Sequence, residues 1–66
     1  MIAYYKLLDM LNKREISKLE LMKRANISRG TLAKLSKNQP VNISTIDSIC
    51  NVLKCQPGDI LEWIEK

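Results

Sequence analysis

Apolar residues recur along this chain with the spacing of amphipathic helices. Between residues 2 and 13 they occupy positions i, i+3, i+4 and i+7, which are Tyr4, Leu7, Leu8 and Leu11. The same spacing returns between residues 43 and 54, at Ile46, Ile49, Cys50 and Leu53. Residues with this period line one face of a helix. The pattern therefore predicts one helix over residues 2–13 and another over residues 43–54.

Two shorter helices are predicted between them, over residues 18–25 and 29–37. Ser17 followed by Glu20 is typical of a capping box, a strong local signal that a helix begins there. The apolar residues expected to face the core are Leu21, Met22, Ala25, Leu32 and Leu35. Both segments thus combine an inner apolar face with a polar outer face.

Asn26, Ile27 and Ser28 separate these two short helices. Asparagine tolerates left-handed backbone angles, and Ile27 can drop inward as a plug. Ser28 can cap the next helix by accepting a hydrogen bond from a free N–H group. A short turn between two helices is typical of the helix-turn-helix unit.

The remaining chain is predicted to contain a loop and a fifth helix. The proline in Asn38-Gln39-Pro40-Val41 predicts a loop, and Asn42 can cap the helix that follows. Pro57 suits the first position of a helix over residues 57–64. Because no segment alternates with a period of two, we expect an all-α fold of five helices in a single domain covering residues 1–66.

Positive charge is concentrated around the two short helices. Residues 13–37 contain eight lysines and arginines against two glutamates, a local net charge of +6, while the rest sums to −2 and the whole chain to +4. A basic patch can be a solvated surface that only keeps a protein soluble. On a helix-turn-helix pattern it favours double-stranded DNA as the partner.

The residue types argue against several other functions. The chain has no histidine, and its two cysteines, Cys50 and Cys55, do not make a tetrahedral metal site. At the end of one helix they are expected to point to different sides and to stay reduced. No Cys/His pair, Gly-rich phosphate loop or evident carboxylate pair is present, so we expect no enzyme and no cofactor. Without a signal peptide or an apolar run of about 20 residues, we expect a cytoplasmic protein with no membrane partner.

The ordered set of motifs resembles the Cro/repressor-type (XRE family) helix-turn-helix domain, in a small stand-alone subgroup. The similarity covers about residues 3–64. It rests on Ile16–Leu21, Ala25–Ser28, Thr31-Leu32 with Leu35, Ile43–Ile46 and the closing segment Ile49–Glu62. The resemblance implies a compact five-helix, lambda-repressor-like domain whose second and third helices read DNA, usually to regulate transcription.

A third helix in the major groove implies a set of DNA contacts. In this geometry its N-terminal residues face base edges, while the preceding helix crosses the phosphate backbone. The residues expected to contact bases are Arg29, Thr31, Lys34 and Ser28. Lys18, at the start of the preceding helix, is expected to contact the DNA backbone. The resemblance implies backbone contacts for Lys37, Asn38 and Asn42 as well, which flank the loop where family members commonly make them. Arg29 is the leading base reader, because a guanidinium can bond O6 and N7 of guanine together.

Several positions depart from the family pattern. Met22 stands where alanine is frequent, and Asn26 and Asn38 stand where glycine is frequent. Gly30 lies early in the third helix, where it lowers helix propensity by about 1 kcal/mol and offers no side chain for readout. These departures affect the details of base contact more than the fold.

One domain of this size covers little DNA, so useful affinity calls for two copies. We expect a transcriptional repressor that binds a palindromic operator as a homodimer, on half-sites about 34–36 Å apart. Trp63 on the fifth helix is expected either to pack on the core or to close the dimer with Ile60 and Ile64. The rival function is a protein-interaction module, such as a toxin-antitoxin antitoxin or an adaptor; a nonspecific architectural DNA binder is a third.

Overall fold

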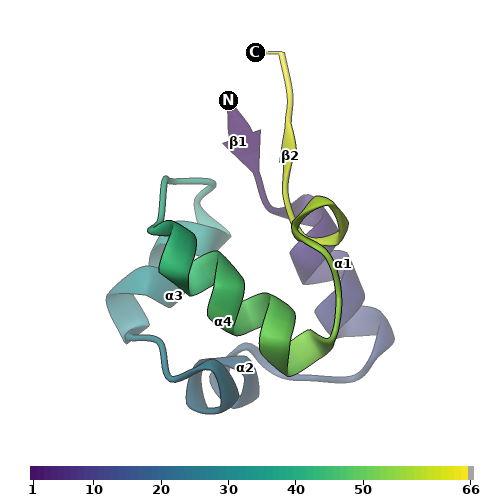
Figure 1. Cartoon of the computed structure of the whole chain (residues 1–66), viewed down its shortest axis with the longest axis vertical. Coiled ribbons are helices and arrows are strands. Elements are labelled where there is room, and N and C mark those ends of the chain that lie inside the picture. The colour runs from purple at the N-terminus through teal and green to yellow at the C-terminus, as the bar shows by residue number, and fades with distance from the viewer. Residues whose placement is uncertain (66) are drawn as a thin grey trace.

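The computed structural model describes residues 1–65, so the last residue of the predicted domain lies outside the described part. The elements follow in the order β1 (Ile2–Ala3), α1 (Tyr5–Lys13), α2 (Lys18–Ala25), α3 (Arg29–Ser36), α4 (Ile43–Leu53), the 3₁₀ turn η1 (Pro57–Asp59) and β2 (Glu62–Trp63). The helices gather around one core, and the two strands project from it side by side (Figure 1). No helix within residues 1–65 is long and apolar enough to cross a membrane.

Three of the predicted helices agree with the structure to within one residue. The helix over 18–25 has the predicted bounds, while those over 29–37 and 43–54 each end one residue earlier than predicted. At the start of α2 the Ser17 hydroxyl accepts a hydrogen bond from the Glu20 N–H at 3.0 Å. In a full capping box the Glu20 carboxylate would also accept from the Ser17 N–H. Here this carboxylate pairs with Arg24 at 2.7 Å instead.

The first helix begins three residues later than predicted. Tyr4 is its N-cap, with non-helical angles of φ −119° and ψ 28°, and Ile2 and Ala3 form strand β1. The apolar stripe nevertheless holds from Tyr4 onward, since Leu7 and Leu11 are buried. Residues before Tyr4 lie outside that stripe, so its period gave no information about where the helix starts.

The fifth helix was wrong, whereas the domain is mostly helical as predicted, with the addition of one two-stranded sheet. Pro57 does begin a helical turn, and the Gln56 N–H donates to the Asp59 carboxylate at 2.9 Å to cap its start, but the turn extends only to Asp59. After Ile60 the chain extends into β2, which pairs antiparallel with β1. A short apolar run fits a helix or a strand equally well, and here a strand partner about 60 residues away decides between them.

The strand pair has a defined register. Ile2 lies opposite Trp63 and Ala3 opposite Glu62. Beyond these, Met1 and Ile64 exchange two main-chain hydrogen bonds, with the Met1 ammonium donating at 2.6 Å and the Ile64 N–H at 2.8 Å. Cross-strand neighbours point to the same face, so Ile2 and Trp63 share one face of the ribbon.

The core is formed by one buried stripe from each helix. Its fully or nearly fully buried members are Ala3, Tyr4, Leu7, Leu11, Leu21, Ala25, Leu35, Ile46, Ile49, Leu53 and Ile60. Helix α4 crosses the middle of the molecule and packs most extensively on α2 (Figure 1). The helix-turn-helix pair is thereby held on one side of α4, while α1 closes the other side.

Tyr4 ties the start of α1 to the loop between α3 and α4. Its backbone N–H donates to Oδ1 of Asn38 at 2.9 Å, and its hydroxyl donates to the Gln39 carbonyl at 2.8 Å. The ring itself is 2% exposed, and this burial raises the pKa of the hydroxyl. Asn38 has a left-handed φ of 56°, which asparagine tolerates better than most residues.

Replacing the Tyr4 hydroxyl tests this connection. We expect Tyr4→Phe to lower the free energy of unfolding by about 1 kcal/mol, because the Gln39 carbonyl loses its donor inside the protein. Tyr5→Phe is the matched control, since Tyr5 is 53% exposed and should stay within about 0.5 kcal/mol of the parent. Urea denaturation of both variants measures the difference, and equal effects would contradict the assigned role of Tyr4.

Candidate nucleic-acid interface

The turn between α2 and α3 has the predicted local chemistry. Asn26 adopts left-handed angles, φ 55° and ψ 47°, and its N–H bonds the Met22 carbonyl. Ile27 is half-buried against the core, and Ser28 begins the next helix with extended angles. These three residues change the chain direction within one short turn, so that α3 lies beside α2 with one face outward.

The Ser28 hydroxyl is engaged within the helix start. Its Oγ accepts a hydrogen bond from the Thr31 N–H at 3.1 Å and lies 3.0 Å from Oγ1 of Thr31. Two of the four side chains predicted as base readers are therefore occupied with each other at the first turn of α3. Their direct role in this structure is to fix that turn.

The outward face of α3 is formed by exposed residues at helical spacing. They are Arg29, Gly30, Ala33 and Lys37, whereas Leu35 on the opposite face is buried. Ala33 was missed by the sequence reasoning, although its position one turn after Arg29 is a signal that could have identified it. A Cβ at Gly30 would meet only the Ser28 Oγ, at 3.8 Å, so packing within the protein does not require glycine there.

A shallow cleft beside α3 brings three other predicted site residues together. Thr31, Lys34 and Asn42 line it along with Pro40, Val41 and Thr45, and its volume is about 180 Å³. Lys34 is exposed in the last turn of α3, and Asn42 is the exposed N-cap of α4. Asn42 makes no side-chain capping bond within its own helix, so its amide remains accessible at this rim.

The residues predicted to contact the DNA backbone lie in different surroundings. Lys18 is the exposed first residue of α2, and Lys37 is the exposed C-cap of α3. Asn38 is half-buried, and its Oδ1 already accepts the hydrogen bond from Tyr4. Its first role is therefore to hold the loop, which sequence reasoning could not detect because its partner lies 34 residues earlier.

Three of the eight cations in the basic segment bind groups within the protein. Lys13 pairs with Asp9 at 3.0 Å, and Arg24 pairs with Glu20 at 2.7 Å. Arg14 donates to the Leu53 carbonyl at 2.7 Å, at the C-terminal end of α4. Within residues 1–65 the other five form no ion pair, and these are Lys18, Lys23, Arg29, Lys34 and Lys37. Four of these five belong to the predicted interface.

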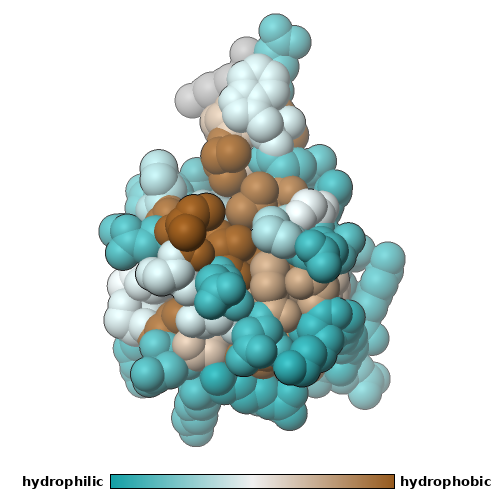
Figure 2. Space-filling view, viewed as in Figure 1, coloured by the Kyte–Doolittle hydropathy of each residue, from teal (hydrophilic) through white to brown (hydrophobic). Residues whose placement is uncertain are grey.

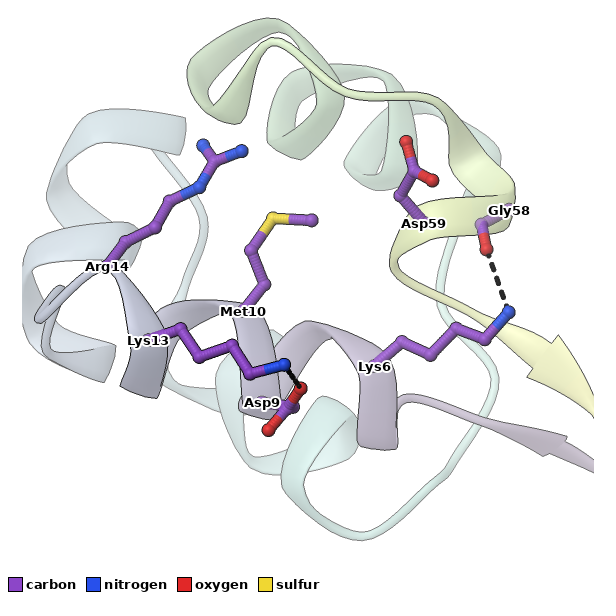
Figure 3. Close-up of a pocket in the computed structure, with 7 residues that line it drawn as sticks. All are labelled: Lys6, Asp9, Met10, Lys13, Arg14, Gly58 and Asp59. Atoms are coloured by element: carbon purple, nitrogen blue, oxygen red, sulfur yellow. Dashed lines mark hydrogen bonds and ion pairs between the residues drawn. The ribbon is translucent and has the colours of Figure 1, made fainter.

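The groove between α1 and η1 is a poor alternative site. It has a volume of about 440 Å³, and Met10 points into it from α1 (Figure 3). Lys6 donates to the Gly58 carbonyl at 3.1 Å, and Lys13 pairs with Asp9. Its lysines are thus already bound within the molecule, whereas the cations around α3 are not.

The three residues predicted for a dimer contact lie in different environments. Ile60 is 0% exposed and belongs to the core. Trp63 is 67% exposed on strand β2, and Ile64 is half-buried beside Met1. Trp63 therefore does not pack on the core, and Ile60 is not available at the surface.

Comparisons with known proteins identify the family and the fold of this chain. Residues 6–66 match the family model described as the Cro/C1-type HTH DNA-binding domain. The chain is 45% identical over 56 residues to the uncharacterized HTH-type transcriptional regulator YozG of Bacillus subtilis (strain 168), covering 82% of this chain and 67% of that protein. The crystal structure of the transcriptional regulator VanUg superposes with a TM-score of 0.94 and 37% identity, over 98% of this chain and 87% of the other.

Removing the Ser28 cap tests the local construction of α3. We expect Ser28→Ala to lower the free energy of unfolding by about 1 kcal/mol, because the Thr31 N–H loses its acceptor. Ser44→Ala is the control, since Ser44 is exposed within α4 and should change stability little. Thermal denaturation followed by circular dichroism measures both, and an unaffected Ser28 variant would show that the hydroxyl does not cap the helix.

Proposed function

This chain belongs to the Cro/C1-type helix-turn-helix DNA-binding family, and we propose that it is a sequence-specific transcriptional repressor that binds a palindromic operator as a homodimer. One observation carries the proposal. The exposed face of α3 begins with Arg29 and is bordered by cations that no carboxylate within residues 1–65 neutralises. Such a surface combines readout of base edges with attraction to phosphates.

Base readout would come from the outward face of α3 in the major groove. Arg29 is the first residue of this helix and can bond O6 and N7 of a guanine. The methyl group of Ala33, one turn later, suits contact with a thymine methyl. Gly30 adds no side chain between them, so the helix backbone can approach the base edges closely.

Phosphate contacts would flank this helix on both sides. Lys18 lies at the N-terminus of α2, where free N–H groups also favour an anion. Lys37 follows α3, while Lys34 and Asn42 share the rim of the cleft next to it. These groups carry no sequence information themselves, but they fix the orientation of α3 in the groove.

The projecting strand pair supports the proposal of a dimer. Trp63 and Ile2 share one face of a two-stranded ribbon, with Trp63 largely exposed. Apolar surface continues from these strands onto the body of the molecule (Figure 2). A second copy covering this face would give the two-fold symmetry that a palindromic operator requires. Repression would follow from occupation of DNA that polymerase needs.

Selection of bound sites from a random duplex library tests the base readout. We expect a palindromic consensus for the parent chain and a relaxed base preference for Arg29→Ala, with a loss of about 1–3 kcal/mol on the best site. Arg24→Ala removes the same charge from α2 at a residue paired with Glu20, and it should keep the consensus.

Two results would contradict sequence-specific repression. If no sequence is enriched and binding only weakens as salt rises, the surface is a generic electrostatic one. If the folded chain does not bind duplex DNA at low salt, the protein-interaction module becomes the better account. In the first case both arginine variants would lose affinity equally.

The dimer contact is tested separately, without DNA and then with it. We expect Trp63→Ala to shift the sedimentation profile toward the monomer, or to abolish cooperative binding to two half-sites if the dimer forms only on DNA. Ile43→Ala is a suitable control because Ile43 is 80% exposed but lies at the start of α4. Unchanged assembly of the Trp63 variant on both tests would place the dimer contact elsewhere.

A further inference from the structure

The end of α4 brings the two cysteines to the same place. Lys54 adopts left-handed angles, φ 54° and ψ 53°, and its N–H bonds the carbonyl of Cys50. The N–H of Cys55 bonds the same carbonyl at 3.2 Å. A bond from the residue after a left-handed position back to the carbonyl five residues earlier is typical of a Schellman motif, and a contact between the side chains of those two residues frequently accompanies it.

The two thiols are neighbours, which corrects the expectation that they point to different sides. That expectation assumed one continuous helix, whereas the left-handed Lys54 turns the chain back. Cys50 and Cys55 are both free, both half-buried, and both line one open groove of about 500 Å³. Burial and then the adjacent Cys55 thiol raise the pKa of Cys50.

The charges around this pair favour a cation. Asp47 and Asp59 line the same groove, and both disfavour negative charge on Cys50. The one cation of the lining, Lys54, directs its Nζ toward Oδ1 of Asn51 at 3.5 Å. A positive ion between the sulfurs would be attracted by the two carboxylates and would offset the two thiolate charges.

We propose that Cys50 and Cys55 form a two-thiolate site for a soft monovalent metal ion, Cu(I). Thiolates are soft ligands that prefer Cu(I), and this ion is satisfied by few ligands. Within residues 1–65 no group of three or more His, Cys, Asp or Glu residues could hold a metal, so a four-ligand zinc site is not built here. Binding would break two S–H bonds, form two S–Cu bonds and release two protons, with no change of oxidation state. The proposal does not depend on DNA binding.

Competition with a coloured Cu(I) chelator, bicinchoninate, tests the site on the full chain under anaerobic conditions with a phosphine reductant. We expect uptake of one copper per chain, and native mass spectrometry should find it on the monomer. Cys50→Ser and Cys55→Ser should each lose this uptake. Met10→Leu is the matched control, since it removes a half-buried thioether sulfur from a different groove and should leave uptake unchanged.

Several outcomes would overturn the proposal. They are failure of the parent chain to compete with the chelator, unchanged uptake by either single cysteine variant, and copper held only between two chains. Circular dichroism checks that each variant is folded. If a serine variant does not fold, Cys50→Ala and Cys55→Ala repeat the test with an apolar residue at the Schellman contact.

Discussion

The link between Tyr4 and the loop after α3 is the contact on which the arrangement depends. One side chain and one backbone N–H connect the start of α1 to Asn38 and Gln39, immediately after the proposed recognition helix. Because Tyr4 is held in this way, α1 begins only at Tyr5 and the preceding residues are free to pair with β2. The same bonds support the left-handed Asn38, which directs the chain from α3 toward α4.

The sequence predicted those parts of the fold that local chemistry determines. Ser17, Asn26 and Ser28 act within three or four residues of their own positions, and the two helices they delimit were placed to within one residue. The fifth helix failed for the opposite reason. Glu62 and Trp63 carry no local signal that separates a helix from a strand, and they pair with a strand from the other end of the chain.

The candidate site was predictable in outline but not residue by residue. Counting charges identified the basic segment, yet it could not reveal that Arg14 binds the end of α4 or that Arg24 pairs with Glu20. Asn38 and Ser28 carry polar groups suited to DNA, but the fold uses those groups internally. What distinguishes Arg29 and Lys18 is that nothing in the described protein binds them, which only three-dimensional neighbours can establish.

The pairing of Met1 with Ile64 has a consequence for the order of folding. The helices form from contacts close in sequence. The strand pair instead closes a loop of almost the whole described chain, and the loss of chain entropy on closing that loop opposes its formation. It is also a bare two-stranded ribbon, an element with little stability of its own. We therefore expect the ribbon to form last during folding and to open first by local fluctuation. On this expectation, a chain still attached to the ribosome holds α3 before it has the surface proposed for pairing with a second copy.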